Sequence, residues 1–255
     1  MDLATLQKIS TQILSREVPT YKRYLYSKID FNSKLIGIKG ARGAGKSTIL
    51  LQYAKSLELP NSKILYVSCD HPAMSGESLY DIAEAFYARG GKLFVIDEIH
   101  KNEHFSKDLK AIYDVFELQV LFSGSSALQI ENSLADLSRR AVIHTLGVLS
   151  LREFCELQTK QTFQSYTLEE ILQNHEDIVF EIKKQIQPLE LFNDYLQFGC
   201  YPFYQESLSD YPIKLLEVIN LTIDSDLCGI YNIDPSKLDK LKKIIYMLCS
   251  TKPYE

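Results

Sequence analysis

The amino-acid sequence predicts an α/β fold, in which a five-stranded parallel sheet occupies the first part of the chain and a mostly helical region follows it. Short apolar runs first alternate with segments of helical periodicity, the pattern of parallel strands joined by helical crossovers. From about Leu149 onward the strand signal disappears, and apolar residues such as Leu189 and Phe192 recur at helical spacing. We therefore predict two domains, residues 1–148 with the sheet and residues 149–255 with the helices.

Each expected element has its own local signal. The five apolar runs expected as strands are Leu35–Lys39, Ile64–Ser68, Leu93–Ile96, Val120–Ser123 and Val142–Leu146. Residues 1–34 are expected to form an N-terminal helical segment. The stretch Thr159–Asp177 is rich in Gln, Glu and Thr and weakly periodic, so we expect an exposed connection there. The sequence stops soon after the apolar helix expected over Leu241–Leu248, which favours a longer natural protein.

Composition narrows the class of protein. The 255 residues, 45% of them hydrophobic, are enough for one large domain with a smaller appendage. A net charge of -5 provides no basic field for nucleic acid, so any such contact would be local. The five cysteines are scattered without a C-x-x-C pair, which argues against a disulfide framework and a zinc site. The sequence shows neither a signal peptide nor an apolar run of about 18 residues, so we expect a cytoplasmic protein without a membrane partner.

The most specific motif is a phosphate-binding loop, or Walker A motif, which follows the first expected strand. Gly40, Gly45, Lys46 and Ser47 have the spacing G-x-x-x-x-G-K-S, and an amphipathic helix comes next. Glycines let backbone N–H groups surround phosphates, lysine adds a mobile charge, and serine supplies an oxygen ligand for Mg²⁺. The residues predicted to bind ATP here are Gly40, Ala41, Arg42, Gly43, Ala44, Gly45, Lys46, Ser47 and Thr48.

A second motif, of the Walker B type, ends the third expected strand. Four apolar residues are followed by Asp97 and Glu98, with one further strand, Ile64–Ser68, between this motif and the loop along the chain. An aspartate there can orient a magnesium-bound water, and the adjacent glutamate can act as general base on the attacking water. We predict Ser47 and Asp97 as metal ligands and Glu98 as the catalytic base.

Two weaker candidates come later in the chain. Ser125 lies just after the fourth expected strand, where its hydroxyl could contact the γ-phosphate, although serine there could equally cap the next helix. Arg139 and Arg140 precede the fifth strand, where a guanidinium could reach a phosphate in cis or from a neighbouring subunit; the alternative is a pair of solvated arginines. His100 and His104 are four residues apart but lack the H-E-x-x-H order and a third ligand, so we expect no zinc.

These motifs together resemble the AAA-superfamily P-loop ATPases of the type that carries an uncharacterised C-terminal domain in many bacteria and archaea. The resemblance covers nearly the whole chain, and its motifs are Gly37–Thr48, Phe94–Lys101, Phe122–Ala127, Ala135–Arg140, Leu149–Phe154 and Phe198–Pro202. It implies an AAA-like ATPase domain, then a helical lid, and then the start of a winged-helix segment.

The resemblance also implies roles for individual residues. Glu98 would be the catalytic base, Ser125 the sensor on the fourth strand, and Arg140 or Arg139 the arginine finger. In related signalling ATPases a Gly-x-Pro in the lid reports bound nucleotide, which makes Gly199 and Pro202 candidates. The signalling branch often has an arginine where this chain has a Ser/Gly-rich end to its fourth strand, so the resemblance does not settle how γ-phosphate would be sensed. Family members usually continue into a nuclease-like domain, but no nuclease activity is inferred here.

The predicted function is that of a magnesium-dependent ATP-hydrolysing molecular switch, with ATP and ADP as ligands. A nucleotide-gated scaffold without hydrolysis is the main alternative, because binding alone can move a lid. A small-molecule kinase would share the loop, but paired carboxylates favour water as the nucleophile. No N-K-x-D or T-K-x-D motif indicates a GTPase. A homo-oligomer or a protein partner is compatible with the motifs, but nothing in the sequence identifies one.

Overall fold

The structure is a computed structural model that describes residues 2–124, 137, 139–227 and 234–250. Its centre is a five-stranded sheet in the order β2-β3-β4-β1-β5, in which all neighbouring strands run parallel. The strands are β1 (Leu35–Gly40), β2 (Ile64–Ser68), β3 (Leu93–Asp97), β4 (Gln119–Gly124) and β5 (Val142–Leu146). The predicted five-stranded parallel sheet is therefore confirmed, with each strand within two residues of its expected bounds.

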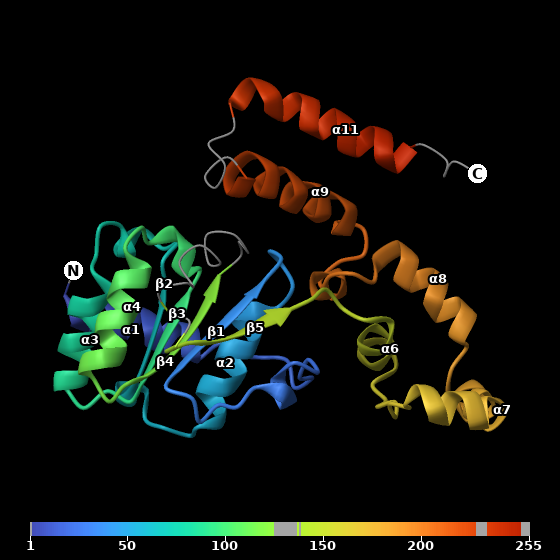
Figure 1. Cartoon of the computed structure of the whole chain (residues 1–255), viewed down its shortest axis with the longest axis horizontal. Helices are drawn as coiled ribbons and strands as arrows, with labels where there is room; N and C mark the ends of the chain where they lie inside the picture. The colour runs from blue at the N-terminus through green and yellow to red at the C-terminus, as the bar shows by residue number, and fades with distance from the viewer. Residues whose placement is uncertain (1, 125–136, 138, 228–233, 251–255) are drawn as a thin grey trace.

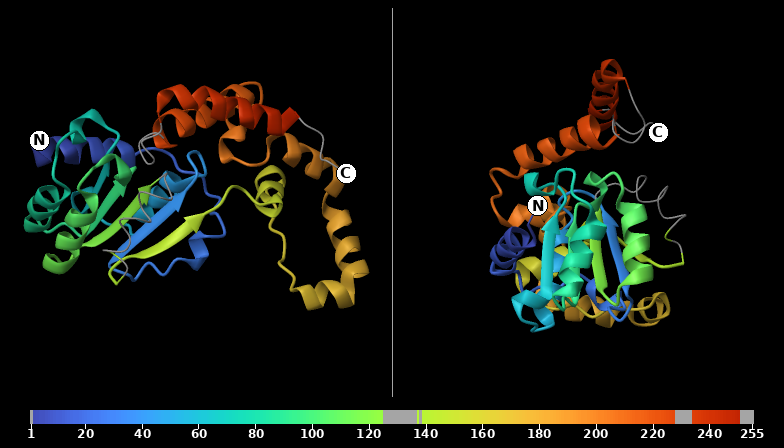
Figure 2. Two further views of the ribbon diagram at one scale, coloured as in Figure 1. Left: turned by 45° about the horizontal axis from the view of Figure 1, so that its top comes forward. Right: turned by 90° about the vertical axis from the view of Figure 1, so that its left-hand side faces the viewer.

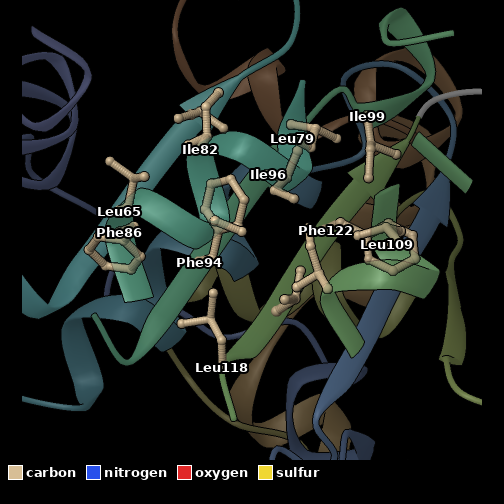
Figure 3. Close-up of a cluster of buried hydrophobic side chains, with 14 of the residues drawn as sticks. Leu65, Leu79, Ile82, Phe86, Phe94, Ile96, Ile99, Leu109, Leu118 and Phe122 are labelled. Atoms are coloured by element: carbon tan, nitrogen blue, oxygen red, sulfur yellow. The ribbon is translucent and has the colours of Figure 1, made fainter. Parts of the chain in front are cut away.

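Helices cover both faces of this sheet, which explains why the inner strands are almost continuously apolar. They are α1 (Leu3–Leu14), α2 (Lys46–Ser56), α3 (Leu79–Ala88) and α4 (Phe105–Val115). On one face α3 and α4 pack against β3 and β4, where Phe86, Phe94 and Phe122 are buried (Figure 3). On the other face α2 packs its Ile49 and Leu50 against the sheet. The two cores fix the carboxyl ends of the strands, where the sequence motifs lie.

The chain after β5 is helical, and Figure 1 and Figure 2 show it as an extended arc rather than a layer upon the sheet. The elements are α6 (Leu151–Thr159), α7 (Leu168–Gln185), α8 (Pro188–Phe198), the 3-10 helix η5 (Pro202–Gln205), α9 (Tyr211–Leu221) and α11 (Leu238–Ser250). A small third core joins α6 to η5 and α9 through Phe154, Tyr204 and Tyr211. None of the helices in the described ranges has the length and apolar character needed to cross a bilayer.

The expected connection over Thr159–Asp177 is only partly a connection, because α7 already begins at Leu168. Thr167 accepts a hydrogen bond from the Glu170 backbone, and the Glu170 side chain accepts one from the Thr167 backbone. This capping box starts a helix where the apolar periodicity is weak. The helix buries none of its described side chains, so the segment is exposed as expected. The division into domains at residue 148 stays a prediction.

Candidate nucleotide-binding site

The loop between β1 and α2 has the backbone that its glycines allow. Gly43 and Gly45 adopt positive φ angles of 81° and 99°, a region in which only glycine is free of strain. Gly45 is the N-cap of α2, so the loop ends at the positive end of the helix dipole. The Lys46 ammonium donates to the carbonyls of Gly40 and Ala41, both at 3.0 Å, and the residue is 4% exposed. The loop thus presents backbone donors and a buried cation together.

Asp97 ends β3 and is held by donors from both neighbouring strands. The Tyr66 hydroxyl of β2 donates to Asp97 Oδ2 at 2.8 Å, and the Ser123 hydroxyl of β4 donates to Oδ1. Burial and then the charge of Asp97 raise the pKa of Tyr66, which keeps its hydroxyl a donor. Hydroxyl donors from both neighbouring strands therefore fix the Asp97 carboxylate at the end of β3.

Glu98, the next residue, has a different environment. Its backbone is in the left-handed region (φ 51°, ψ 43°), which is uncommon for a residue with a Cβ and typical of functional sites. Burial raises the pKa of Glu98, and the charge of Asp97 raises it further, against the opposing charges of Lys46 and Arg42. Within the described part of the chain, its Oε2 is buried without a hydrogen-bond partner, 3.5 Å from His100 Nε2.

A pocket of about 410 Å³ brings these residues together with the lid. It is lined by Pro19, Gly43, Gly45, Lys46, Ser47, Thr48, Glu98, Pro202, Phe203, Gln205 and Glu206. The Phe203 ring packs so closely on the loop that a Cβ added to Gly43 would lie 2.8 Å from it. Pro202 lines the same pocket, with its Cγ 3.8 Å from where a Cβ on Gly45 would lie. Residues of the predicted lid element thus lie beside the loop, and a role for Pro202 at the nucleotide stays a prediction.

Gly199, the other residue expected in the lid motif, is not among the residues that line this pocket. It is the C-cap of α8, where its backbone N–H donates to the carbonyl of Tyr195 at 2.8 Å. A Cβ at this position would lie 2.0 Å from the Tyr195 ring, so the glycine is explained by local packing. A role for Gly199 at the nucleotide stays a prediction. Ser125 lies outside the described residues.

Arg139 and Arg140 lie before the amino end of β5, whereas their own loop lies at the carboxyl ends of the strands. The loop follows the carboxyl end of β1, whereas both arginines precede β5, which runs parallel to β1. From Arg140 to Leu146, the partner of Gly40, the chain extends about 20 Å at the usual rise per residue. Arg140 instead forms a two-point ion pair with Asp114 at the end of α4. The cis interpretation is therefore wrong, and contact from a neighbouring subunit stays a prediction.

A larger cleft of about 930 Å³ lies beside the site, between the loops that follow β2 and Glu98. It contains Cys69, His71 and His104, among other polar residues. No group of three metal-ligating side chains occurs among the described residues. Two hydroxyl residues of the nucleotide site, Tyr66 and Ser123, were missed because only their three-dimensional contacts with Asp97 give them a role.

The fold and the site define a class of protein. A parallel sheet in the order 2-3-4-1-5, with a glycine-rich phosphate loop after β1 and a carboxylate pair after β3, is a P-loop nucleotide-binding domain of the AAA type. Residues 32–155 match the AAA_14 family model, described as an AAA domain. This part of the chain is thus an AAA_14 P-loop domain, and such a domain implies ATP binding.

The chain is also similar to parts of proteins from other organisms. A relative in Methanocaldococcus jannaschii, Uncharacterized protein MJ1637, is 30% identical over 94% of this chain. The chain spans 55% of the length of that relative. Similar solved structures include Pif1 helicase from Candida albicans (14% identity, TM-score 0.38, 58% of this chain and 46% of that one). Another is AMPPCP-bound DnaA from Aquifex aeolicus (12% identity, TM-score 0.33, 69% of this chain and 59% of that one).

Proposed function

We propose that this chain hydrolyses ATP with Mg²⁺ and uses the nucleotide state of its loop to move the helical lid. The observation that carries the proposal is a pocket in which residues of the loop, Glu98 and residues of the lid meet. Lys46 would pair with the β- and γ-phosphates, and the N–H groups from Gly40 to Thr48 would surround them. Pro202 lines the same pocket as Gly45, so nucleotide bound to the loop would lie directly against the lid.

The residues expected to hold Mg²⁺ offer suitable oxygens. Ser47 supplies a hydroxyl and Asp97 a carboxylate, the hard donors that Mg²⁺ prefers, usually directly or through water. The hydrogen bonds from Tyr66 and Ser123 fix the orientation of the Asp97 carboxylate, as outer partners do in metal sites. When bound, Mg²⁺ would neutralise charge on the phosphate oxygens. The donor set therefore fits the metal.

Glu98 is the proposed general base. Among the described residues its Oε2 accepts no hydrogen bond and lies 3.5 Å from His100 Nε2, and Glu98 lines the pocket in which the attacking water would lie. The raised pKa makes its carboxylate a stronger base than an ordinary glutamate. Lys46 lies near enough to influence that pKa, so base and phosphate-binding cation face the same space. The pair of carboxylates and the lid favour hydrolysis over phosphoryl transfer to a substrate hydroxyl.

A second copy of the chain would complete the site under this proposal. Arg140 lies at the opposite end of β5 from its own loop, so it could act as an arginine finger only on a neighbouring subunit. Exposed apolar side chains on α8, α9 and α11, such as Leu189, Leu216 and Leu248, favour a protein partner on the helical arc. Hydrolysis by an isolated chain is accordingly expected to be slow, and activity is best compared as a ratio between variants.

The test is Glu98→Gln, with Glu103→Gln as the matched control. Glutamine keeps the shape of Glu98 but cannot accept the proton, so kcat should fall by about 100-fold or more while ATP affinity is retained. Glu103 is an exposed glutamate near the site but outside the pocket, and its substitution should leave both values unchanged. Equal hydrolysis by wild type and Glu98→Gln would refute the mechanism and favour a nucleotide-gated scaffold.

A further inference from the structure

A short N-terminal segment, residues 19–24, lies between the nucleotide loop and the first lid helix, and we call it the strap. Gln52 of α2, the helix that continues the loop, donates to the carbonyls of Pro19 and Tyr21, both at 2.8 Å. At the other side, the hydroxyls of Tyr21 and Tyr24 donate to Glu156 of α6, at 2.9 Å and 2.5 Å. The strap is therefore tied both to the loop helix and to the lid.

Arg23 is the centre of the strap. One of its nitrogens donates to the carbonyl of Ala44 in the loop at 2.8 Å, and two donate to the Glu153 carboxylate of α6 at 2.7 Å and 3.1 Å. Gly147 and Val148 lie in the segment that joins β5 to α6, and Arg23 also donates to both of their carbonyls at 3.0 Å. The residue is only 9% exposed. A planar guanidinium presents donors in fixed directions, so this one side chain fixes the loop and the lid relative to each other.

Glu153 is held as a charged partner although it is buried. Burial alone would raise the pKa of Glu153, but hydrogen bonds from Arg23, Ser150 and Tyr24 and the charge of Arg23 together lower it. The Glu153 carboxylate accepts the Ser150 backbone N–H at 3.0 Å, which forms the capping box that starts α6. Loss of Arg23 would leave a buried carboxylate without its cation at the first turn of the lid.

A series of side-chain contacts within the lid connects α6 back to the nucleotide loop. Phe154 packs on Tyr204 of η5 with ring centres 5.0 Å apart, and on Tyr195 of α8 with centres 5.6 Å apart. The neighbour of Tyr204, Phe203, packs on Gly43 of the loop. The contacts therefore form a path that begins at Ala44 of the loop and returns to the loop at Gly43, with the buried ion pair of Arg23 and Glu153 as one of its steps.

We propose that Arg23 is a positioning residue that orients the nucleotide loop and couples its phosphate-bound state to α6. The mechanism follows from peptide geometry. Because the Ala44–Gly45 peptide is planar and trans, its N–H points opposite to its carbonyl. Arg23 holds that carbonyl, and so it sets the direction of the Gly45 N–H, which belongs to a residue lining the pocket. A phosphate bound to this N–H would stiffen the same peptide, and Arg23 would pass that change to Glu153. This inference rests on the proposed ATP binding.

The experiment compares amide hydrogen exchange of α6, residues 151–159, without nucleotide and with saturating Mg²⁺ and a non-hydrolysable ATP analogue. In wild-type protein, binding of the ATP analogue is expected to slow amide exchange in α6. Arg23→Lys cannot make the forked contact, so ATP affinity should fall by about tenfold or more, and at saturation the nucleotide-dependent slowing in α6 should disappear. The matched control is Arg16→Lys, an exposed arginine that precedes the strap, which should behave as wild type.

The outcomes separate coupling from mere stability and from the proposed function. If Arg23 had a purely structural role, Arg23→Lys would raise amide exchange in α6 both with and without nucleotide and would keep the difference between the two states. That result would overturn the inference. Tyr24→Phe removes one hydroxyl contact to Glu156 and leaves Arg23 in place, so it provides a test should Arg23→Lys not fold. It should bind ATP nearly as wild type but show a smaller change in α6. Wild-type protein that binds ATP without any change in α6 refutes coupling alone, whereas failure to bind ATP refutes the proposed function.

Discussion

The contact between Tyr66 and Asp97 gives the sharpest quantitative prediction. The Tyr66 hydroxyl donates to Asp97 Oδ2 at 2.8 Å, and the residue is 3% exposed. Tyr66→Phe removes one oxygen and keeps the ring within the hydrophobic core. A hydrogen bond to a charged group contributes roughly 1.5–3 kcal/mol, which corresponds to about 10- to 150-fold in an equilibrium constant. Loss of an outer partner in metal sites has a similar effect, about 10- to 100-fold.

The assay is the dependence of ATP hydrolysis on Mg²⁺ at fixed ATP. For Tyr66→Phe the half-saturating Mg²⁺ concentration should rise by about tenfold or more, while the rate at saturating Mg²⁺ stays close to wild type. Tyr53→Phe is the matched control, because Tyr53 is 7% exposed and donates its hydroxyl to Gln119 at the amino end of β4, away from the pocket. If both variants shared the wild-type Mg²⁺ dependence, Asp97 would not be a metal ligand oriented by Tyr66.

Three further predictions concern the loop and the base. Lys46→Ala should abolish ATP binding, because it removes the cation expected to meet the phosphates; a fluorescent analogue bound with wild-type affinity would contradict the site. Gly43→Ala should lower the melting temperature more than Gly45→Ala. Both lose about 1–2 kcal/mol to left-handed backbone, but only a Cβ at Gly43 meets Phe203 at 2.8 Å, and equal melting temperatures would contradict this packing. Since Glu98 must be deprotonated and its pKa is raised, kcat should fall with decreasing pH above the usual glutamate range; an acidic limb within that range would argue against Glu98 as the base.

The fold could be predicted because its signal is local. Strands buried on both faces are short continuous apolar runs, and the helices between them show helical spacing, so neither requires knowledge of distant residues. The phosphate loop is likewise a contiguous motif, and its glycines have the positive φ angles that the motif demands. The start of α7 was signalled by Thr167 and Glu170 as a capping box, but the polar composition of the segment concealed it.

The missing parts of the site depend on contacts between distant residues. The hydroxyls on Asp97 come from Tyr66 and Ser123, which are 31 and 26 residues away from it. In an apolar strand each of them resembles an ordinary core position, and only the strand order brings them together. For Arg140, by contrast, a usable signal was present. Residues that precede a parallel strand lie at its amino end, whereas the loop lies at the carboxyl end of β1, so the cis interpretation conflicted with the predicted topology.

The different roles of the two adjacent carboxylates follow from their surroundings. Asp97 ends the strand, where the hydrogen bonds from Tyr66 and Ser123 hold its oxygens in one orientation, as a metal ligand requires. Glu98 leaves the strand through left-handed backbone and lines the pocket, and its buried Oε2 lies 3.5 Å from His100 Nε2. Burial raises the pKa of Glu98, which makes its carboxylate a stronger base than an ordinary glutamate. Exchanging the two residues would therefore place each side chain in the surroundings of the other. The double variant Asp97→Glu/Glu98→Asp should lose ATP hydrolysis although the total charge and composition of the pair are unchanged.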